Sequence, residues 1–120
     1  MKYLPALEAL ADMLTAAGIR SALDWRGLNP PGVWVTPGPL TTGTLGDDYH
    51  ALAHCTAVVP PSEETQAYRE LDKITGPLLE ALAAAGYPVI SAEPVTVGGS
   101  PSATSPLPAI RITTEIYLGD

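Results

Sequence analysis

The spacing of hydrophobic residues near the start of the chain predicts an amphipathic helix over residues 4–17. Apolar side chains recur there three or four positions apart, while Glu8, Asp12 and Thr15 occupy the other side. This is the period of a helix that buries one face. Pro5 fits the first turn of such a helix, and Gly18 is suited to end it in a left-handed conformation.

A second helix is predicted over residues 62–86. Ser62 is followed by two glutamates, which the dipole of a helix N-terminus favours. Apolar residues then continue along one helical face as far as Gly86. We expect a bend or break at Gly76-Pro77, because Pro77 cannot donate a backbone hydrogen bond to Lys73.

Other segments show the shorter period of strands. Strands are predicted at about 19–24, 33–35, 50–59, 89–97 and 109–118. The last has the clearest alternation, and Pro94 makes the strand 89–97 an edge strand or a bulged one. Residues 36–48 and 98–106 are rich in Gly, Pro, Ser and Thr and are predicted to be long loops. The pattern therefore predicts one α+β domain over residues 1–120, with two helices packed on one face of a small, mainly antiparallel sheet.

Composition narrows the functional classes. Of the 120 residues 46% are hydrophobic and 16% are charged, and thirteen acidic residues against six basic ones give a net charge of −7. The basic residues form no cluster, which argues against binding nucleic acid through its phosphates. The N-terminus interrupts its apolar pattern with Glu8 and Asp12, so we expect no signal peptide. No stretch approaches the ~20 apolar residues of a membrane span, and we expect a soluble protein made in a cytoplasm, without membrane partners.

His50, His54 and Cys55 are the only group with the composition of a metal site. On a strand, four residues at ~3.3 Å each separate the two histidines by about 13 Å, whereas Zn–N bonds are ~2.0–2.1 Å. Cys55 would face away from His54, so the histidine cannot act as its base. The pattern favours a half-exposed sheet face with a cysteine in the core, and we expect no metal and no catalytic thiol.

No other motif carries chemistry. The segment from Gly98 to Pro101 lacks the strand-turn-helix setting of a nucleophile elbow or a phosphate loop. Asp47 and Asp48 have the composition of a cation site, although two carboxylates in a glycine-rich turn are more often solvated. We therefore expect no enzymatic activity and no cofactor. Trp25 and Trp34 are either core or interface anchors, since tryptophan is favoured in both places. Of the two, we expect Trp34 to lie in the core and Trp25 nearer a subunit boundary.

The segment from Asp24 to Val35, DWRGLNPPGVWV, resembles a run common in tail terminator proteins of long-tailed, siphovirus-type bacteriophages that infect actinobacteria. In these proteins an Asp-x-Arg-x-Leu-Asn-Pro-Pro turn leads into a Val-Trp-Val strand. Further pieces agree in order and spacing over most of the chain. They are the helix ending Ala16-Ala17-Gly18, Val58-Val59-Pro60, Leu71-Asp72, and Leu107-Pro108-Ala109 before Ile110-Arg111-Ile112-Thr113.

The resemblance implies a structural virion protein. Tail terminators form a ring, usually of six copies, that caps the tail tube and offers a docking surface to the head. The implied partners are further copies of the chain, the major tail tube protein and a head-tail connector or stopper protein, with DNA passing through unbound at the tail-neck junction. The implied family fold is a small sheet with two helices packed on it. We expect the interface to include Trp25, Arg26, Leu28, Asn29, Asp47 and Asp48.

Two other functions are compatible with the sequence. The first is another head-tail connector, a ring component of the neck beside the terminator. The second is a small soluble enzyme or ligand-binding domain whose site has no recognisable motif.

Overall fold

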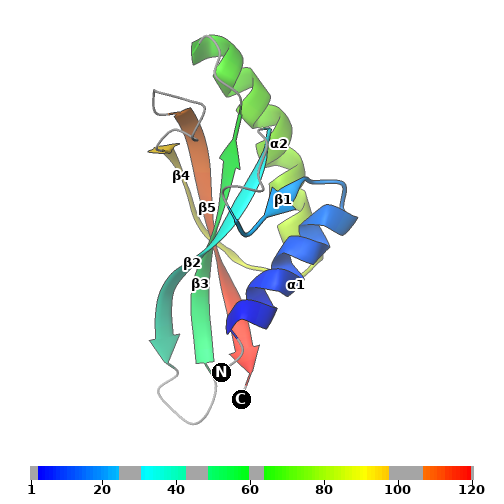
Figure 1. Cartoon of the computed structure of the whole chain (residues 1–120), viewed down its shortest axis with the longest axis vertical. Helices are drawn as coiled ribbons and strands as arrows, with labels where there is room; N and C mark the ends of the chain where they lie inside the picture. The colour runs from blue at the N-terminus through cyan, green and yellow to red at the C-terminus, as the bar shows by residue number, and fades with distance from the viewer. Residues whose placement is uncertain (1–2, 25–30, 43–48, 60–63, 98–106, 120) are drawn as a thin grey trace.

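The computed structural model describes residues 3–24, 31–42, 49–59, 64–97 and 107–119. Its elements follow the order α1, β1, β2, β3, α2, β4, β5. Both helices lie along the same side of the sheet (Figure 1). The protein is thus an α+β protein with two helices on one face of a mostly antiparallel sheet, as the hydrophobic pattern predicts.

Helix α1 spans Tyr3–Ala16 and buries a leucine on each of three successive turns: Leu7, Leu10 and Leu14. It ends at Gly18, whose φ of 86° lies in the left-handed region that glycine adopts readily. The amide of Ile19 reaches back to donate a hydrogen bond to the carbonyl oxygen of Leu14, at 2.9 Å. The predicted glycine cap is therefore confirmed.

Helix α2 spans Glu64–Ala84, and the turn that follows it contains Gly86, which has a φ of 83°. The helix continues through Gly76-Pro77 without interruption, so the alternative of a break at this point is wrong. The predicted bend stays a prediction. Pro77 still removes one backbone donor from the helix interior. Burial of Leu71, Leu78 and Leu82 against the sheet offsets that loss, since packing of an apolar face stabilises a helix more than propensity does.

The sheet has the strand order β1-β2-β3-β5-β4. Strands β2 (Gly32–Thr42), β3 (Tyr49–Val58), β5 (Leu107–Gly119) and β4 (Val89–Val97) pair antiparallel, and β1 (Ser21–Ala22) pairs parallel with the start of β2. Strand β4 lies at one edge of the sheet, and this confirms the edge position predicted from Pro94.

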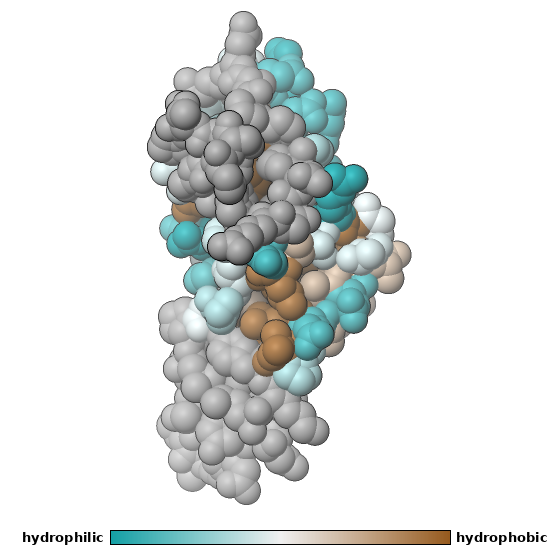
Figure 2. All heavy atoms as spheres, in the orientation of Figure 1, coloured by the Kyte–Doolittle hydropathy of each residue, from teal (hydrophilic) through white to brown (hydrophobic). Residues whose placement is uncertain are grey.

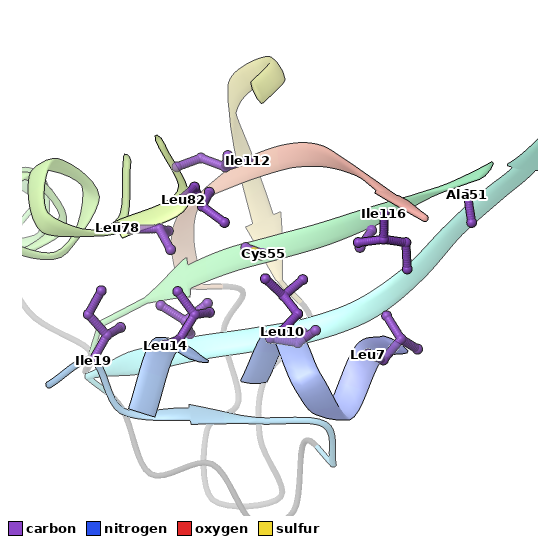
Figure 3. Close-up of a cluster of buried hydrophobic side chains, with 13 residues drawn as sticks. Leu7, Leu10, Leu14, Ile19, Ala51, Cys55, Leu78, Leu82, Ile112 and Ile116 are labelled. Atoms are coloured by element: carbon purple, nitrogen blue, oxygen red, sulfur yellow. The ribbon is translucent and has the colours of Figure 1, made fainter. Parts of the chain in front are cut away.

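The main core lies between the helices and the sheet (Figure 3). The buried leucines Leu7, Leu10, Leu14, Leu78 and Leu82 of the two helices point toward side chains that alternate along the strands, among them Cys55 of β3 and Ile112 and Ile116 of β5. All of these residues are at most 6% exposed. Since successive strand residues face opposite sides, the residues between them lie on the face away from the helices, which we call the outer face.

Two sequence predictions need correction. The strand predicted at 33–35 is β2, which runs on to Thr42, so residues 36–42 of the predicted loop 36–48 are strand. The reason is the long partner β3, whose pairing continues past Pro37 by a register shift between Pro37 and Leu40. The strand predicted at 19–24 is only the two residues of β1. Residues 43–48 and the predicted loop 98–106 lie outside the described residues.

Candidate interaction surfaces

The six residues predicted to form the interface all lie outside the described residues. They are Trp25, Arg26, Leu28, Asn29, Asp47 and Asp48. Their role stays a prediction. The surfaces below are built from the residues that the structure describes.

Trp34 is on the outer face of the sheet, between Val33 and Val35, which point into the main core. It is half-buried and packs against a small second cluster centred on Val58 and Ala109. Its indole Nε1 donates a hydrogen bond to the carbonyl oxygen of Leu23, at 3.3 Å. The predicted core position of Trp34 is therefore wrong: Trp34 is an anchor of the outer face and is not part of the main core.

His54 and Cys55 are on opposite faces of β3, as the strand period requires. On the outer face, His54 Nδ1 lies 3.1 Å from Thr113 Oγ1. Partial burial lowers the pKa of His54, the nearby Arg111 charge lowers it further, and Glu93 opposes both effects. On the core side, burial raises the pKa of the Cys55 thiol to about 12. The thiol is thus protonated at neutral pH, which is the unreactive form.

The outer face also holds a polar row that crosses three strands. Thr56 of β3 pairs with Arg111 of β5, and Arg111 pairs with Glu93 of β4. Arg111 Nη1 lies 3.9 Å from a carboxylate oxygen of Glu93, and both side chains are substantially exposed. A pair of this kind contributes little to stability. Within the described residues, no group of three or more His, Cys, Asp and Glu side chains is placed to hold a metal ion.

Among the residues that the structure describes, three hollows of about 340 Å³ each can be compared. One lies where α1 meets the turn after α2 and is lined mainly by small or apolar residues with Glu115. Another lies beside Tyr68, β4 and the start of β5 and has no charged residue among its described lining. The third lies between the end of α1 and the middle of α2 and has two cations in its wall, Arg20 and Lys73. It is the most distinctive of the three chemically.

Arg20 and Lys73 were not among the residues predicted to be functional. They are far apart in the sequence, and each stands alone among residues of other kinds, so no motif joins them. Only the packing of the segment after α1 against α2 brings both to one hollow.

Several large hydrophobic side chains are exposed: Leu4 (60%), Ile90 (54%), Tyr68 (49%) and Val89 (41%). In Figure 2, hydrophobic and hydrophilic residues lie side by side in the region where α1 runs along the molecule. Scattered exposed apolar residues are ordinary on a monomer, so they gain meaning only in combination with neighbouring charges.

The two edges of the sheet are partly protected. Strand β1 covers β2 only at Val33 and Trp34, and within the described residues no other strand pairs with the outer edge of β2. That open stretch contains Pro37, Pro39 and a bulge, and the opposite edge strand contains Pro94. Prolines and bulges oppose uncontrolled pairing of edges, so neither edge is a smooth template for adding a strand.

No family model matches the chain, and no curated protein sequence is significantly similar to it. Neither helix of the described structure is long and apolar enough to cross a membrane.

Proposed function

We propose that this chain is a structural subunit of a bacteriophage tail, a tail terminator that assembles into a ring at the end of the tail tube. The observation that carries the proposal is the order of motifs from the Asp24–Val35 segment to the Ile110–Thr113 strand, which resembles the tail terminators in a chain of this length. The α+β fold with two helices on one face agrees with what that resemblance implies.

The surface supports an assembly role in two ways. Both helices cover the same face, so the outer face with Trp34 and Arg111 has no helix over it among the described elements. In addition, Leu4 and Ile90 each expose more than half of their surface. Aromatic residues and arginine are enriched on surfaces that bind other proteins, and the outer face presents Trp34 and Arg111.

In this role the partners are further copies of the chain in a ring of six, the major tail tube protein and a head-tail connector or stopper protein. The location is the tail-neck junction of the virion, after assembly in the host cytoplasm. Another head-tail connector of the neck would share the ring and differ in its contacts. A small enzyme or ligand-binding domain would instead act as a monomer or dimer.

Measuring the size of the purified full-length chain tests the proposal. Light scattering over a range of concentrations, with negative-stain electron microscopy of the same samples, is expected to show rings or a tendency to polymerise. Adding purified tail tubes is expected to place rings at tube ends, which separates a terminator from a neck component. A monomer or dimer at every concentration that neither binds tubes nor forms rings would overturn the proposal.

A ligand screen tests the alternative function, a small enzyme or ligand-binding domain. A small enzyme or binding domain should show a rise in melting temperature with its ligand, because a ligand that binds only the folded state stabilises it. Such a shift in a chain that never assembles would favour the alternative function.

A further inference from the structure

We propose that the hollow between the end of α1 and the middle of α2 is a docking site for one exposed face of α1 of a second copy of this chain. We call it the basic hollow and define it by Ile19, Arg20, Pro31, Lys73, Ile74 and Pro77. This inference rests on the proposed ring function and names one contact through which neighbouring copies would bind.

The charge of the basic hollow is unusual for this protein. The chain carries a net charge of −7 with only six basic residues, yet two of them line this one hollow. Its described lining contains no Asp or Glu. The remaining walls are apolar, so the hollow combines a hydrophobic floor with two cations. A partner that fits must present an apolar side chain next to carboxylates.

Arg20 and Lys73 both have contacts within their own chain. Their positive charges would nevertheless attract the carboxylates of a second copy. Lys73 Nζ lies 3.2 Å from a carboxylate oxygen of Glu70, and the Lys73 side chain is 71% exposed. An exposed pair of this kind contributes little, so Lys73 would exchange or share its partner at small cost. Arg20 also has an interaction within the chain. Arginine has five donors, and it would keep that interaction while binding a further carboxylate.

The matching surface is a stripe on α1 formed by Leu4, Glu8 and Asp12, which we call the acidic stripe. These residues are four positions apart, so they lie one above another on the same face of the helix. Leu4 is 60% exposed, and Glu8 and Asp12 are exposed as well. The helix contains no Lys or Arg that would neutralise the two carboxylates.

The two surfaces complement each other in both charge and polarity. Leu4 would contact the apolar floor formed by Ile74 and Pro77, and the two carboxylates would approach the two cations. Along the helix axis, at 1.5 Å per residue, Asp12 is about 9 Å and Leu4 about 21 Å from Gly18, so most of the stripe lies away from the hollow of its own chain. Contact between two different surfaces is head-to-tail, and such a contact closes into a ring or continues as a filament.

Charge neutralisation tests this contact in the full-length chain. One variant removes the stripe charges (Glu8→Gln with Asp12→Asn), and the other removes the hollow charges (Arg20→Gln with Lys73→Gln). The matched control is Asp72→Asn with Glu80→Gln, two exposed carboxylates of α2 outside the hollow lining. Sedimentation velocity is expected to show the dissociation constant of self-association rising about tenfold or more in both variants, with little change in the control.

Mixing the two variants gives a sharper result. The stripe variant keeps its basic hollow and the hollow variant keeps its acidic stripe, so an equimolar mixture should form one-to-one pairs and nothing larger. Melting temperatures equal to the parent protein show that the variants fold. If a charge variant fails to fold, Leu4→Gln serves instead, since a mostly exposed side chain contributes little to the core and its loss should still weaken association.

The outcomes separate this inference from the proposed function. Charge variants that assemble as the parent and control proteins do would overturn the docking site and leave the ring intact. A parent protein that never self-associates, with or without tail tubes, would overturn the ring and the docking site together. One-to-one pairs that form in the mixture, and not in either variant by itself, would support the head-to-tail contact.

Discussion

Thr114 of β5 holds the turn before β4 in place, since its Oγ1 donates a hydrogen bond of 2.7 Å to the carbonyl oxygen of Pro88. Thr114 is fully buried. The bond joins the last residue of β5 that pairs with β4 to the residue that precedes β4. The same carbonyl oxygen also accepts a hydrogen bond from the amide of Glu115, at 3.3 Å, so it keeps one donor when the hydroxyl is removed.

We expect Thr114→Val to lower the free energy of unfolding by about 0.5–1.5 kcal/mol, since valine keeps the shape of threonine and removes one hydrogen bond. Thr75→Val is the matched control. The Oγ1 of Thr75 is buried and has no hydrogen-bond partner among the described residues, so its removal should be neutral or stabilising. Urea denaturation measures both variants. Equal losses from the two substitutions would contradict the structural role of the Thr114 bond.

Two glycines are expected to respond in opposite directions to substitution by alanine. At Gly38 an added Cβ would lie 2.8 Å from the backbone oxygen of Leu52, inside van der Waals contact, while at Gly76 it would meet nothing within 4 Å. Gly38→Ala should destabilise the protein by about 1–3 kcal/mol, because the backbone of β3 cannot move aside freely.

Gly76→Ala should stabilise the protein by about 0.5–1 kcal/mol, because alanine is favoured over glycine inside a helix. Comparing Gly38→Ala with Gly76→Ala also tests the pairing of β2 with β3, since Gly38 lies where β2 changes register against β3. Thermal unfolding of both variants measures the difference. A stabilising Gly38→Ala would contradict the close approach of β2 to the backbone of β3 at Leu52.

The buried thiol of Cys55 should make stability depend on alkaline pH. Burial raises its pKa from 9.0 to about 12, so the folded state holds the proton at pH values where the unfolded state releases it. The stabilisation is fully present below pH 9 and is lost as the pH rises from 9 toward 12. The loss approaches about 1.4 kcal/mol per pH unit within that window.

Comparison with Cys55→Ala isolates this effect from the titration of lysines and tyrosines, which the two proteins share. The unfolding free energy of the parent should fall more steeply between pH 9 and 11 than that of the variant. The native thiol should also react with a thiol reagent at pH 8 only as fast as the protein unfolds. Parallel pH profiles, or rapid modification of the folded protein, would count against the buried position of Cys55.

Trp34 should contribute less to stability than a residue of the main core. It is half-buried on the outer face, whereas Leu10 is fully buried between α1 and the sheet. Leu10→Ala is expected to cost about 2–5 kcal/mol through the cavity it leaves. Trp34→Ala should cost about 1–2 kcal/mol, since water can fill the space that the indole leaves on the partly open outer face and no closed cavity forms. A Trp34→Ala loss as large as that of Leu10→Ala would mean that the outer face has a core of its own.

The helices and three of the strands could be predicted from the sequence, because their apolar residues keep a regular period and glycines mark the helix ends. The predicted strand 33–35 is shorter than β2, because Pro37, Gly38 and Pro39 are residues that disfavour strands. Pairing with β3 extends the strand through them. The face occupied by Trp34 was predictable in principle. It lies between two valines that point into the core, and a strand places the middle residue of three on the opposite side.

The basic hollow was beyond prediction for a different reason. Arg20 and Lys73 meet only through the packing of the segment after α1 against α2, and neither has a local pattern that distinguishes it from other surface cations. The acidic stripe was visible in the sequence as the polar side of a helix. A binding role for the acidic stripe can be inferred only once a complementary surface is known, and that surface is formed by the tertiary structure.

The chain is expected not to bind duplex DNA. With a net charge of −7 per copy, a ring of six would carry 6 × (−7) = −42. Two of the cations are also beside carboxylates, Lys73 with Glu70 and Arg111 with Glu93. A lining without continuous positive charge does not bind phosphates in a salt-dependent way, which suits a conduit through which a genome slides.

A gel-shift assay at low salt should show no retention of duplex DNA at micromolar protein. A variant with the acidic stripe reversed (Glu8→Lys with Asp12→Lys) tests whether added positive charge creates binding. Retention of duplex DNA by the parent protein that weakens steeply with salt would exclude a passive conduit.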